Sequence, residues 1–166
     1  LQRKLTGSIQ KDKIKQIHYQ VSEWFEKQGF ISEAIHQAIN SQSFDLAREI
    51  IEKYWISELN KDHWFTVIQW LPLIPDEMTD KSVSLSLLKA QVYYLQNNFE
   101  KIPPILDRIR NTDQNLANYE EGFLACLDSI FSFINGRGDE AIQFAEKALR
   151  LIPNEYYRFR SDEESW

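Results

Sequence analysis

Apolar residues recur at intervals of three and four along most of this chain, a spacing that predicts α-helices. The clearest stretch runs from Ile14 to Trp55 and divides into three helices at two short turns, Gln28-Gly29 and Asn40 to Ser43. Gly29 stands where the first helix should end, at a position that often needs a positive φ angle. One face of that helix is predicted to carry Ile14, Ile17, Val21, Trp24 and Phe25.

The second of these helices has small residues as well as large ones on its apolar face. Ala34 and Ala38 stand four residues apart, which lets a neighbouring helix approach closely. A helix, a glycine turn and a second helix with alanines at this spacing are typical of a tetratricopeptide repeat. In that motif Ala34 takes position 20, Gly29 takes position 15, and the first helix supplies His18, Val21, Ser22 and Phe25 at positions 4, 7, 8 and 11.

The same register recurs along the chain. Its position-20 residues are Ala34, His63, Ile102 and Ala141, which are separated by 29, 39 and 39 residues. The last copy is the most regular, with Gly136 at 15 and Ala141, Ala145 and Ala148 at 20, 24 and 27. Four degenerate copies of a helix pair predict an all-α protein, a tetratricopeptide-like α-solenoid of antiparallel helix pairs.

The predicted organisation has three parts. Residues 1–13 form a basic linker or the tail of a preceding domain, with a break at Thr6-Gly7-Ser8; residues 14–153 form the repeat domain; and residues 154–166 begin a truncated next helix, with Ser161 as its cap. Loose connectors are expected at Ser57 to Asp62 and at Asp76 to Ser82. The other predicted helices begin at Phe44 after a Ser43 cap and cover 64–74, 84–95, 100–110, 123–134 and 139–152.

Composition supports a folded protein. Hydrophobic residues make up 43% of the 166 residues and charged residues 27%. No apolar run is long enough to span a bilayer, and the single cysteine, Cys126, fits a reducing compartment. We therefore expect a cytoplasmic protein without membrane association. The chain begins at Leu1 without a signal-like segment, so we expect a piece of a longer protein.

The net charge of −6 is unevenly spread. Asp12 is the only acidic residue among the first fifteen, which hold Arg3, Lys4, Lys11, Lys13 and Lys15. Because nucleic-acid affinity comes mainly from neutralising phosphates, the acidic remainder predicts no direct nucleic-acid contact. The basic start is interpreted as a solvated linker, and the alternative is a contact with a phosphate or an acidic partner.

Three segments together resemble one known family. EWFEKQGFISEAIHQAINSQSFDLAREIIEKYW, WFTVIQWLPLIPDEM and SLLKAQVYYLQNNFEKIPPILDRI resemble the helical region of MalT-like transcriptional activators, bacterial regulators of the LuxR type that are also classed as signal-transducing ATPases. The resemblance runs from about Leu5 to Pro153. It implies the arm and the first part of a sensor region, which takes up an effector or a regulatory protein and contacts other domains of the parent regulator.

The chain lacks the catalytic parts of that family. It has no GxxxxGK[ST] phosphate-binding loop and no recognition-helix module at its C-terminus. No cofactor is therefore expected in this chain, and the ATP site is expected in a P-loop domain elsewhere in the parent protein. A generic tetratricopeptide scaffold that joins proteins is the alternative function.

No enzyme site is predicted from the polar residues. The histidines His18, His36 and His63 lack a second metal ligand at helical spacing, so structural or surface roles are expected and no metal site. Cys126 lies among apolar neighbours and is interpreted as a buried, inert thiol. The five tryptophans are interpreted as core residues, with ligand binding as the alternative.

Recognition is expected on the concave face of the repeats, which their first helices line. The residues predicted to bind an effector or partner are Tyr19, Glu23, Arg48, Glu52, Gln91 and Tyr94. Arg48 could grip a carboxylate or a phosphate with two hydrogen bonds. The alternative is that Arg48 forms an i,i+4 surface ion pair with Glu52.

Overall fold

A computed structural model describes residues 2–113 and 115–152, and it describes the side chains from residue 10 onward. All the regular secondary structure of the described residues is helical, with no β-strand among them, so the predicted all-α class is confirmed. The helices divide into two compact units. Unit 1 comprises residues 1–59 and 63–78, and unit 2 comprises residues 60–62 and 79–166.

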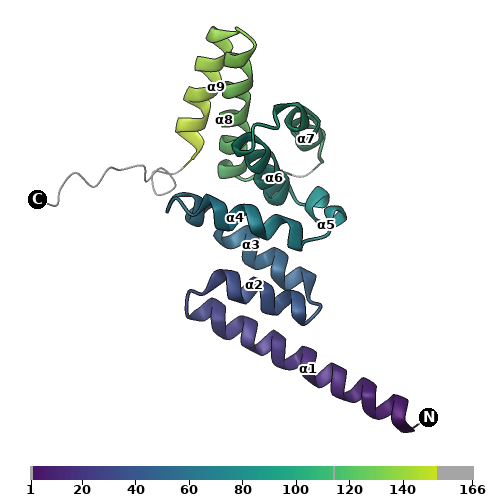
Figure 1. Cartoon of the computed structure of the whole chain (residues 1–166). Helices are drawn as coiled ribbons and strands as arrows, with labels where there is room; N and C mark the ends of the chain where they lie inside the picture. The colour runs from purple at the N-terminus through teal and green to yellow at the C-terminus, as the bar shows by residue number, and fades with distance from the viewer. Residues whose placement is uncertain (1, 114, 153–166) are drawn as a thin grey trace, which may run out of the picture. The chain divides into compact units, whose positions relative to one another are not determined.

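Unit 1 holds four helices that follow one another side by side (Figure 1). They are α1 (Gln2–Lys27), α2 (Ile31–Asn40), α3 (Phe44–Leu59) and α4 (Trp64–Trp70), and α4 continues into the 3₁₀-helix η1 (Leu71–Leu73). Pro72 lies in η1, and its missing N–H explains why the predicted helix of residues 64–74 does not continue as a regular α-helix to its end. The core is a set of side chains with almost no exposed surface, chiefly Ala34, Ile35, Ala47, Ile51, Trp55 and Val67.

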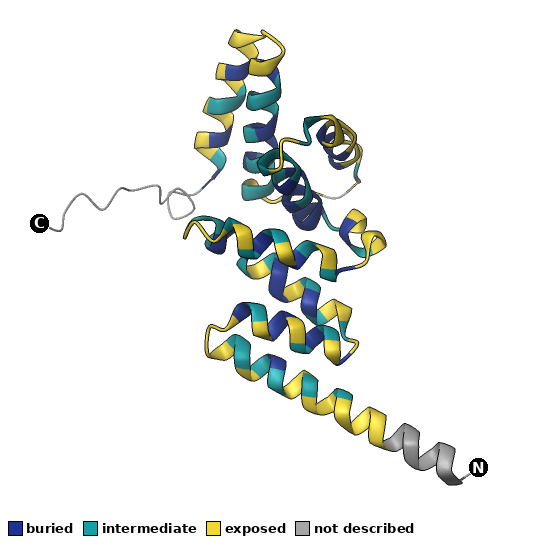
Figure 2. Cartoon of the chain, in the orientation of Figure 1, coloured by how far each residue is buried: buried dark blue, intermediate teal, exposed yellow. Residues whose placement is uncertain are grey.

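Unit 2 holds two more helix hairpins. Helices α6 (Val83–Leu95) and α7 (Ile102–Arg110) are joined through the 3₁₀-helix η2 (Phe99–Lys101), and α8 (Asn118–Ile134) pairs with α9 (Gly138–Leu151). The short helix α5 (Asp76–Lys81) precedes them. Buried faces lie between the helices (Figure 2). At one contact α8 comes so near the end of α9 that a Cβ atom on Gly122 would collide with Ile152.

Five helices end with the same hydrogen-bonded turn. In each, a residue with positive φ precedes a backbone N–H that donates to the carbonyl oxygen five residues earlier, the Schellman arrangement. The positive-φ residues are Gly29, Gln42, Asp62, Asn97 and Gly136. The bonds run from Phe30 to Phe25, Ser43 to Ala38, His63 to Glu58, Asn98 to Tyr93 and Arg137 to Ser132, with N···O distances of 2.8–3.0 Å.

These turns correct the predicted register of the second hairpin. Helix α3 runs to Leu59, through half of the predicted loose connector, so its turn falls one helical turn later than expected. His63 precedes α4 with its side chain about half exposed, whereas Val67 is fully buried and takes the place that Ala34 has in the first hairpin. The equivalent residues are therefore 34, 67, 102 and 141, which are 33, 35 and 39 residues apart.

The first and last hairpins also share a side-chain hydrogen bond. The Ser22 hydroxyl donates to the Ala34 carbonyl oxygen at 2.7 Å, and the Ser129 hydroxyl donates to the Ala141 carbonyl oxygen at 2.8 Å. Each pair is separated by twelve residues and occupies positions 8 and 20 of the predicted motif. The two hairpins therefore cross with the same local geometry, although their remaining sequences differ.

Other boundaries differ from the predictions. Helix α1 passes without interruption through Thr6-Gly7-Ser8 and through residue 13, where a break and a linker were expected. A glycine in a helix interior costs only about 1 kcal/mol relative to alanine, which good helix formers on both sides can offset. The expected connector from Asp76 to Ser82 forms α5, and α8 begins five residues before the predicted Phe123. The predicted helix of residues 154–166 lies outside the described residues.

The apolar face predicted for α1 is mostly exposed. Ile14, Ile17 and Trp24 keep 47%, 57% and 54% of their surface accessible. Helix α1 contacts α2 through a neighbouring side instead, where Ser22 is buried and the His18 ring lies 2.6 Å from the Gln37 side-chain oxygen. The exposed apolar residues of α1 therefore lie on a different side of the helix from the residues that contact α2.

Candidate functional site

An open apolar groove in unit 2 is the main candidate for an interaction site. Its volume is about 600 Å³. Helices α8 and α9 form most of it, and the end of α6 with η2 supplies the remainder. The residues that line it are Tyr94, Phe99, Ser129, Ile130, Phe133, Ile134, Gly138, Ala141, Ile142 and Ala145.

Small residues and the shared hydrogen bond of the hairpin create this groove. The Ser129–Ala141 bond draws α8 and α9 together, and Gly138 and Ala145 add little side-chain volume to the groove. Large apolar side chains therefore lie around the groove without filling it. Phe133, Ile134 and Ile142 keep 75%, 57% and 61% of their surface exposed. Exposed apolar surface gathered in this way is typical of protein-interaction sites.

Ala145 takes a small-residue position of the repeat register, where close approach of a neighbouring helix was expected, and the structure differs there. Ala145 is half-buried and lines the open groove, so its neighbourhood has room for a larger side chain. Ala148 is the crowded position in α9. It is 2% exposed and belongs to a small core with Ala125 and Ile152, against which Phe123 and Cys126 pack.

A second, polar pocket of about 310 Å³ lies between α7, α8 and α9. Its charged side chains are paired with one another. The Arg110 guanidinium donates to the Asp128 and Asp107 carboxylates, and Arg137 lies 2.9 Å from Glu140. Burial raises the pKa of Asp128, and the adjacent Arg110 opposes that rise. Because these charged side chains form ion pairs with one another, we interpret them as stabilising the packing of α7, α8 and α9 rather than as binding a ligand.

The predicted recognition residues fall in both units. In unit 1, Tyr19 and Glu23 lie on α1, and Arg48 and Glu52 lie on α3. Tyr19 is 39% exposed and Glu23 is half-buried. In unit 2, Gln91 and Tyr94 lie half-buried on α6, and Tyr94 contributes to the apolar groove. The Tyr94 ring meets Phe99 edge to face, with 5.9 Å between the ring centroids.

Arg48 is engaged within its own helix. Its guanidinium lies 2.9 Å from Glu52, with Glu49 and Asp45 at 3.7 and 3.9 Å. The structure therefore contains the i,i+4 pair that was the alternative to a ligand-binding arginine. Binding a carboxylate or phosphate here would require displacing three acidic neighbours.

The remaining candidate residues, His36, His63 and Cys126, are not among the residues that line the two pockets. The His63 ring lies 2.7 Å from the Glu58 carboxylate, and His36 is exposed on α2. Cys126 is half-buried, and burial raises the pKa of its thiol. Among the residues that the structure describes, no group of three histidine, cysteine or acidic side chains could hold a metal ion. None of the described helices is long and apolar enough to cross a membrane.

The tryptophans divide between core and surface. Trp55 and Trp70 are buried, and the Trp70 indole N–H donates to the Ser32 hydroxyl at 3.0 Å. Trp24 is about half exposed, contrary to the expected core position. Trp64 is half-buried and stacks on the exposed Phe65.

The groove was not predicted from the sequence. Recognition was expected on polar residues of the first helices, whereas apolar residues of α8 and α9 form most of the groove. The Phe133-Ile134 pair immediately before the Asn135-Gly136 turn was the available signal, because large apolar residues at a helix end seldom all find core partners. No protein-family model matches the chain. No solved structure matches it significantly.

Proposed function

We propose that this chain is the tetratricopeptide-like region of a bacterial MalT-like transcriptional activator of the LuxR type, and that it serves there as a regulatory protein-interaction region. The resemblance of Trp24 to Trp55 and of the Trp64 to Pro75 segment to that family supports the assignment. Repeated hairpins with equivalent turns and a shared Ser–Ala hydrogen bond support an α-solenoid.

The apolar groove of unit 2 is the single observation that carries the interaction role. A small polar inducer would need convergent hydrogen-bonding groups in an enclosed site. The groove is instead open, and most of its lining residues are apolar. A helix or extended segment of a protein, which brings apolar side chains of its own, matches this surface better. We therefore assign partner-protein binding to this groove.

A generic tetratricopeptide scaffold is the second candidate function, because the same groove could join proteins that have no role in transcription. The parent reading frame discriminates between the two. A regulator requires a P-loop domain and a LuxR-type helix-turn-helix in the same reading frame. A reading frame that ends near Trp166 without either domain would contradict the regulator and favour the scaffold.

Transcript measurement in the source bacterium tests the role of the groove. Transcripts that depend on the gene are first defined by comparing a deletion strain with the wild type. Phe133→Asp on the chromosome is expected to reproduce the loss of those transcripts, because a buried unpaired carboxylate would disfavour a partner in the groove.

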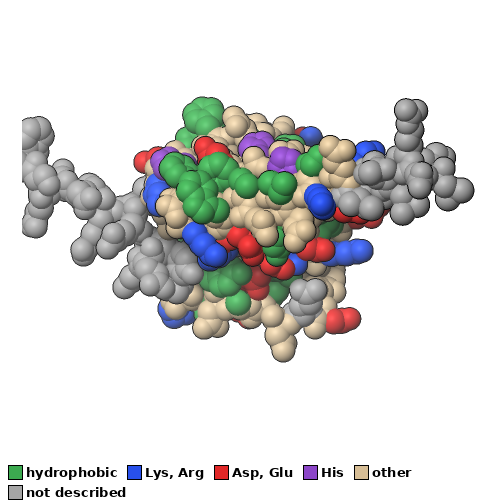
Figure 3. All heavy atoms as spheres, turned by 90° about the horizontal axis from the view of Figure 1, so that it is seen from below, with side chains coloured by type: hydrophobic (Ala, Val, Ile, Leu, Met, Phe, Trp, Pro, Cys, Tyr) green, Lys and Arg blue, Asp and Glu red, His purple; other side chains and the backbone are tan. Residues whose placement is uncertain are grey.

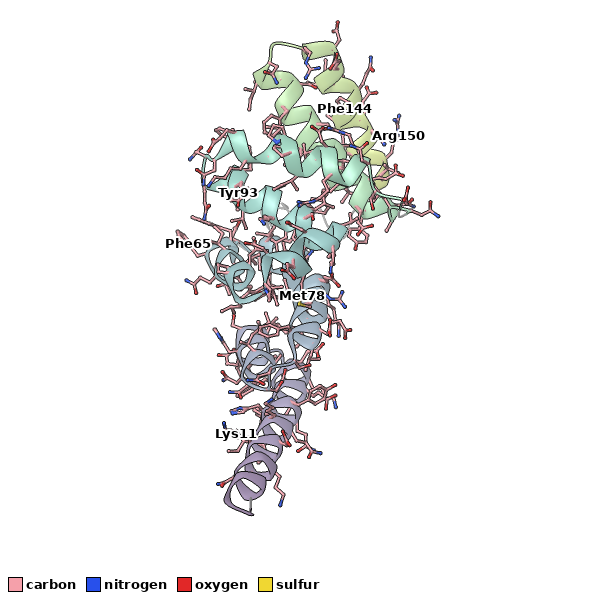
Figure 4. The ribbon with its side chains drawn as sticks, turned by 90° about the vertical axis from the view of Figure 1, so that its right-hand side faces the viewer. Lys11, Phe65, Met78, Tyr93, Phe144 and Arg150 are labelled. Carbon is pink, nitrogen blue, oxygen red and sulfur yellow. The ribbon has the colours of Figure 1, made fainter. Side chains whose placement is uncertain are left out.

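Phe65→Asp is the matched control for this experiment. Phe65 is 65% exposed and projects from α4, outside the groove (Figure 4). This control is expected to retain the gene-dependent transcripts, and immunoblots establish that both variants accumulate equally. Equal transcript profiles for Phe133→Asp and the wild type would exclude the groove from the regulatory function.

A further inference from the structure

The side of α1 that does not contact α2 carries a second apolar surface, which is about half exposed in the described part of unit 1. Ile17 and Trp24 are seven residues apart, two helical turns, and each is more than half exposed. Ile14 extends the same surface and is 47% exposed. Figure 3 views unit 1 from the α1 side and shows hydrophobic side chains gathered there, with both acidic and basic side chains around them. We call Ile14, Ile17 and Trp24 the α1 stripe.

Helix α9 presents a stripe with the same spacing beside the groove. Ile142 and Leu149 are also seven residues apart and are 61% and 65% exposed. Phe133 and Ile134 of α8 border the groove from the opposite side. A helix that lies between α8 and α9 would meet apolar side chains from both, over a length of about two helical turns.

The two surfaces carry opposite charges at their edges. On α1, Lys13 precedes Ile17 by four residues and Lys27 follows Trp24 by three. Residues at these spacings are neighbours on a helix surface, so both lysines lie beside the α1 stripe. On α9, Asp139 precedes Ile142 by three residues, and Glu146 follows Ile142 by four. These four charged residues are exposed. Lys13 and Lys27 beside one apolar stripe therefore complement Asp139 and Glu146 beside the other, and Arg150 lies one helical turn beyond Glu146.

We propose that α1 of one copy of this chain docks in the α8/α9 groove of a second copy. The stripes agree in spacing, in apolar character and in complementary edge charge. The buried side of α1, at Ser22 and His18, stays in contact with α2, so docking leaves the first hairpin intact. This inference rests on the proposed function, since it names a partner for the same groove.

Contacts between two different surfaces are heterologous. Each added copy exposes a new groove and a new α1 stripe, so association continues into an open series unless the geometry closes a ring. A symmetric contact between identical surfaces would stop at a dimer. The size distribution of the assembly therefore distinguishes head-to-tail docking from a symmetric dimer.

Sedimentation velocity of the full chain over a wide range of protein concentration tests the proposal. The wild type is expected to form species larger than a dimer as concentration rises, and added salt is expected to weaken this association by screening the edge charges. Ile17→Glu places a carboxylate in the α1 stripe, and Ile142→Glu places one beside Phe133 and Ile134 in the groove. Each variant alone is expected to stay monomeric at concentrations where the wild type associates.

An equimolar mixture of the two variants is the decisive measurement. Ile17→Glu retains an intact groove and Ile142→Glu retains an intact α1 stripe, so the mixture should form a one-to-one dimer and nothing larger. Both substituted side chains are more than half exposed, and circular dichroism verifies that each variant folds. Phe65→Glu, which changes an equally exposed apolar side chain on α4, should associate like the wild type.

Several results would overturn the proposal. A monomeric wild type at every concentration, association unaffected by either substitution, association that salt does not weaken, or a mixture that fails to dimerise would each exclude this docking. A loss of association in Phe65→Glu would indicate non-specific hydrophobic contact. None of these results would by itself contradict the proposed function, because the transcript experiment measures whether the groove is needed for regulation whatever protein occupies it.

Discussion

At the scale of single residues, the Arg110–Asp128 pair offers the clearest dependence on pH. The Asp128 side chain keeps only 12% of its surface exposed, and burial raises its pKa above the ordinary value of 3.8. The folded state therefore binds more protons than the unfolded state between these two pKa values. Stability contributed by this group consequently falls as pH rises through that window.

We predict that Arg110→Met destabilises the protein by about 1–2 kcal/mol at neutral pH, because it leaves a mostly buried carboxylate without its cation. The loss should shrink as pH falls through the raised pKa of Asp128, where the carboxyl group becomes neutral. Urea denaturation at a series of pH values measures both effects.

Arg137→Met is the control for this prediction. Its partner Glu140 keeps 49% of its surface exposed, so this pair should contribute less than about 1 kcal/mol. Equal losses for Arg110→Met at neutral and acidic pH would show that the arginine stabilises through packing rather than through the charge of Asp128.

Single residues also show what the sequence can reveal about turns. Gly29 was expected at a helix end, and Asn97 and Gly136 fall between predicted helices; all three have positive φ. Gln42 and Asp62 have positive φ as well. The turn between Asn40 and Ser43 was predicted, but not the residue that takes this conformation. Asp62 was missed because α3 was expected to end several residues earlier, and that error shifted the whole register of the second hairpin.

At the scale of helices, periodicity predicted where apolar faces exist but not what covers them. The face of α2 was predicted correctly, since Ala34, Ile35 and Ala38 are fully buried. The face of α1 was predicted by the same rule, yet Ile17 and Trp24 are exposed. A repeating apolar pattern indicates that a helix face packs against another surface. It does not indicate whether that surface belongs to the same chain.

The two alanines of α9 allow a prediction at this scale. Ala148→Leu should destabilise the protein by about 1–3 kcal/mol, because Ala125 and Ile152 leave no space for a larger side chain. Ala145→Leu should have little effect on the free energy of unfolding, because the side chain would extend into the groove. Denaturant titration of both variants measures the difference. Similar losses for the two substitutions would mean that the groove is narrower than the structure indicates.

At the scale of the whole molecule, the repeat domain predicted for residues 14–153 contains two compact units, each with its own buried core. The core of unit 1 includes Ile35 and Trp55, and the core of unit 2 includes Leu88 and Ile102, all with no exposed surface. Regular hairpin spacing suggested one continuous array. The sequence gives no clear sign of the boundary, because α5, which spans it, has the polar composition expected for a simple connector.

The two cores predict that the units can be destabilised separately. Tryptophan emission should report unit 1, which holds Trp24, Trp55, Trp64 and Trp70, once Trp166 is replaced by phenylalanine. In that background, Ile35→Ala and Leu88→Ala should each cost about 2–5 kcal/mol in their own unit, because each leaves a cavity in a buried core.

Ile35→Ala should therefore shift the tryptophan transition in a urea titration, and Leu88→Ala should leave it in place. Circular dichroism, which reports helices of both units, should detect a destabilised fraction in each variant. If Leu88→Ala moved the tryptophan transition as far as Ile35→Ala does, the two units would have to unfold as one cooperative body. In that case a partner bound in the groove of unit 2 would stabilise the α1 hairpin as well, by the linkage between binding and folding.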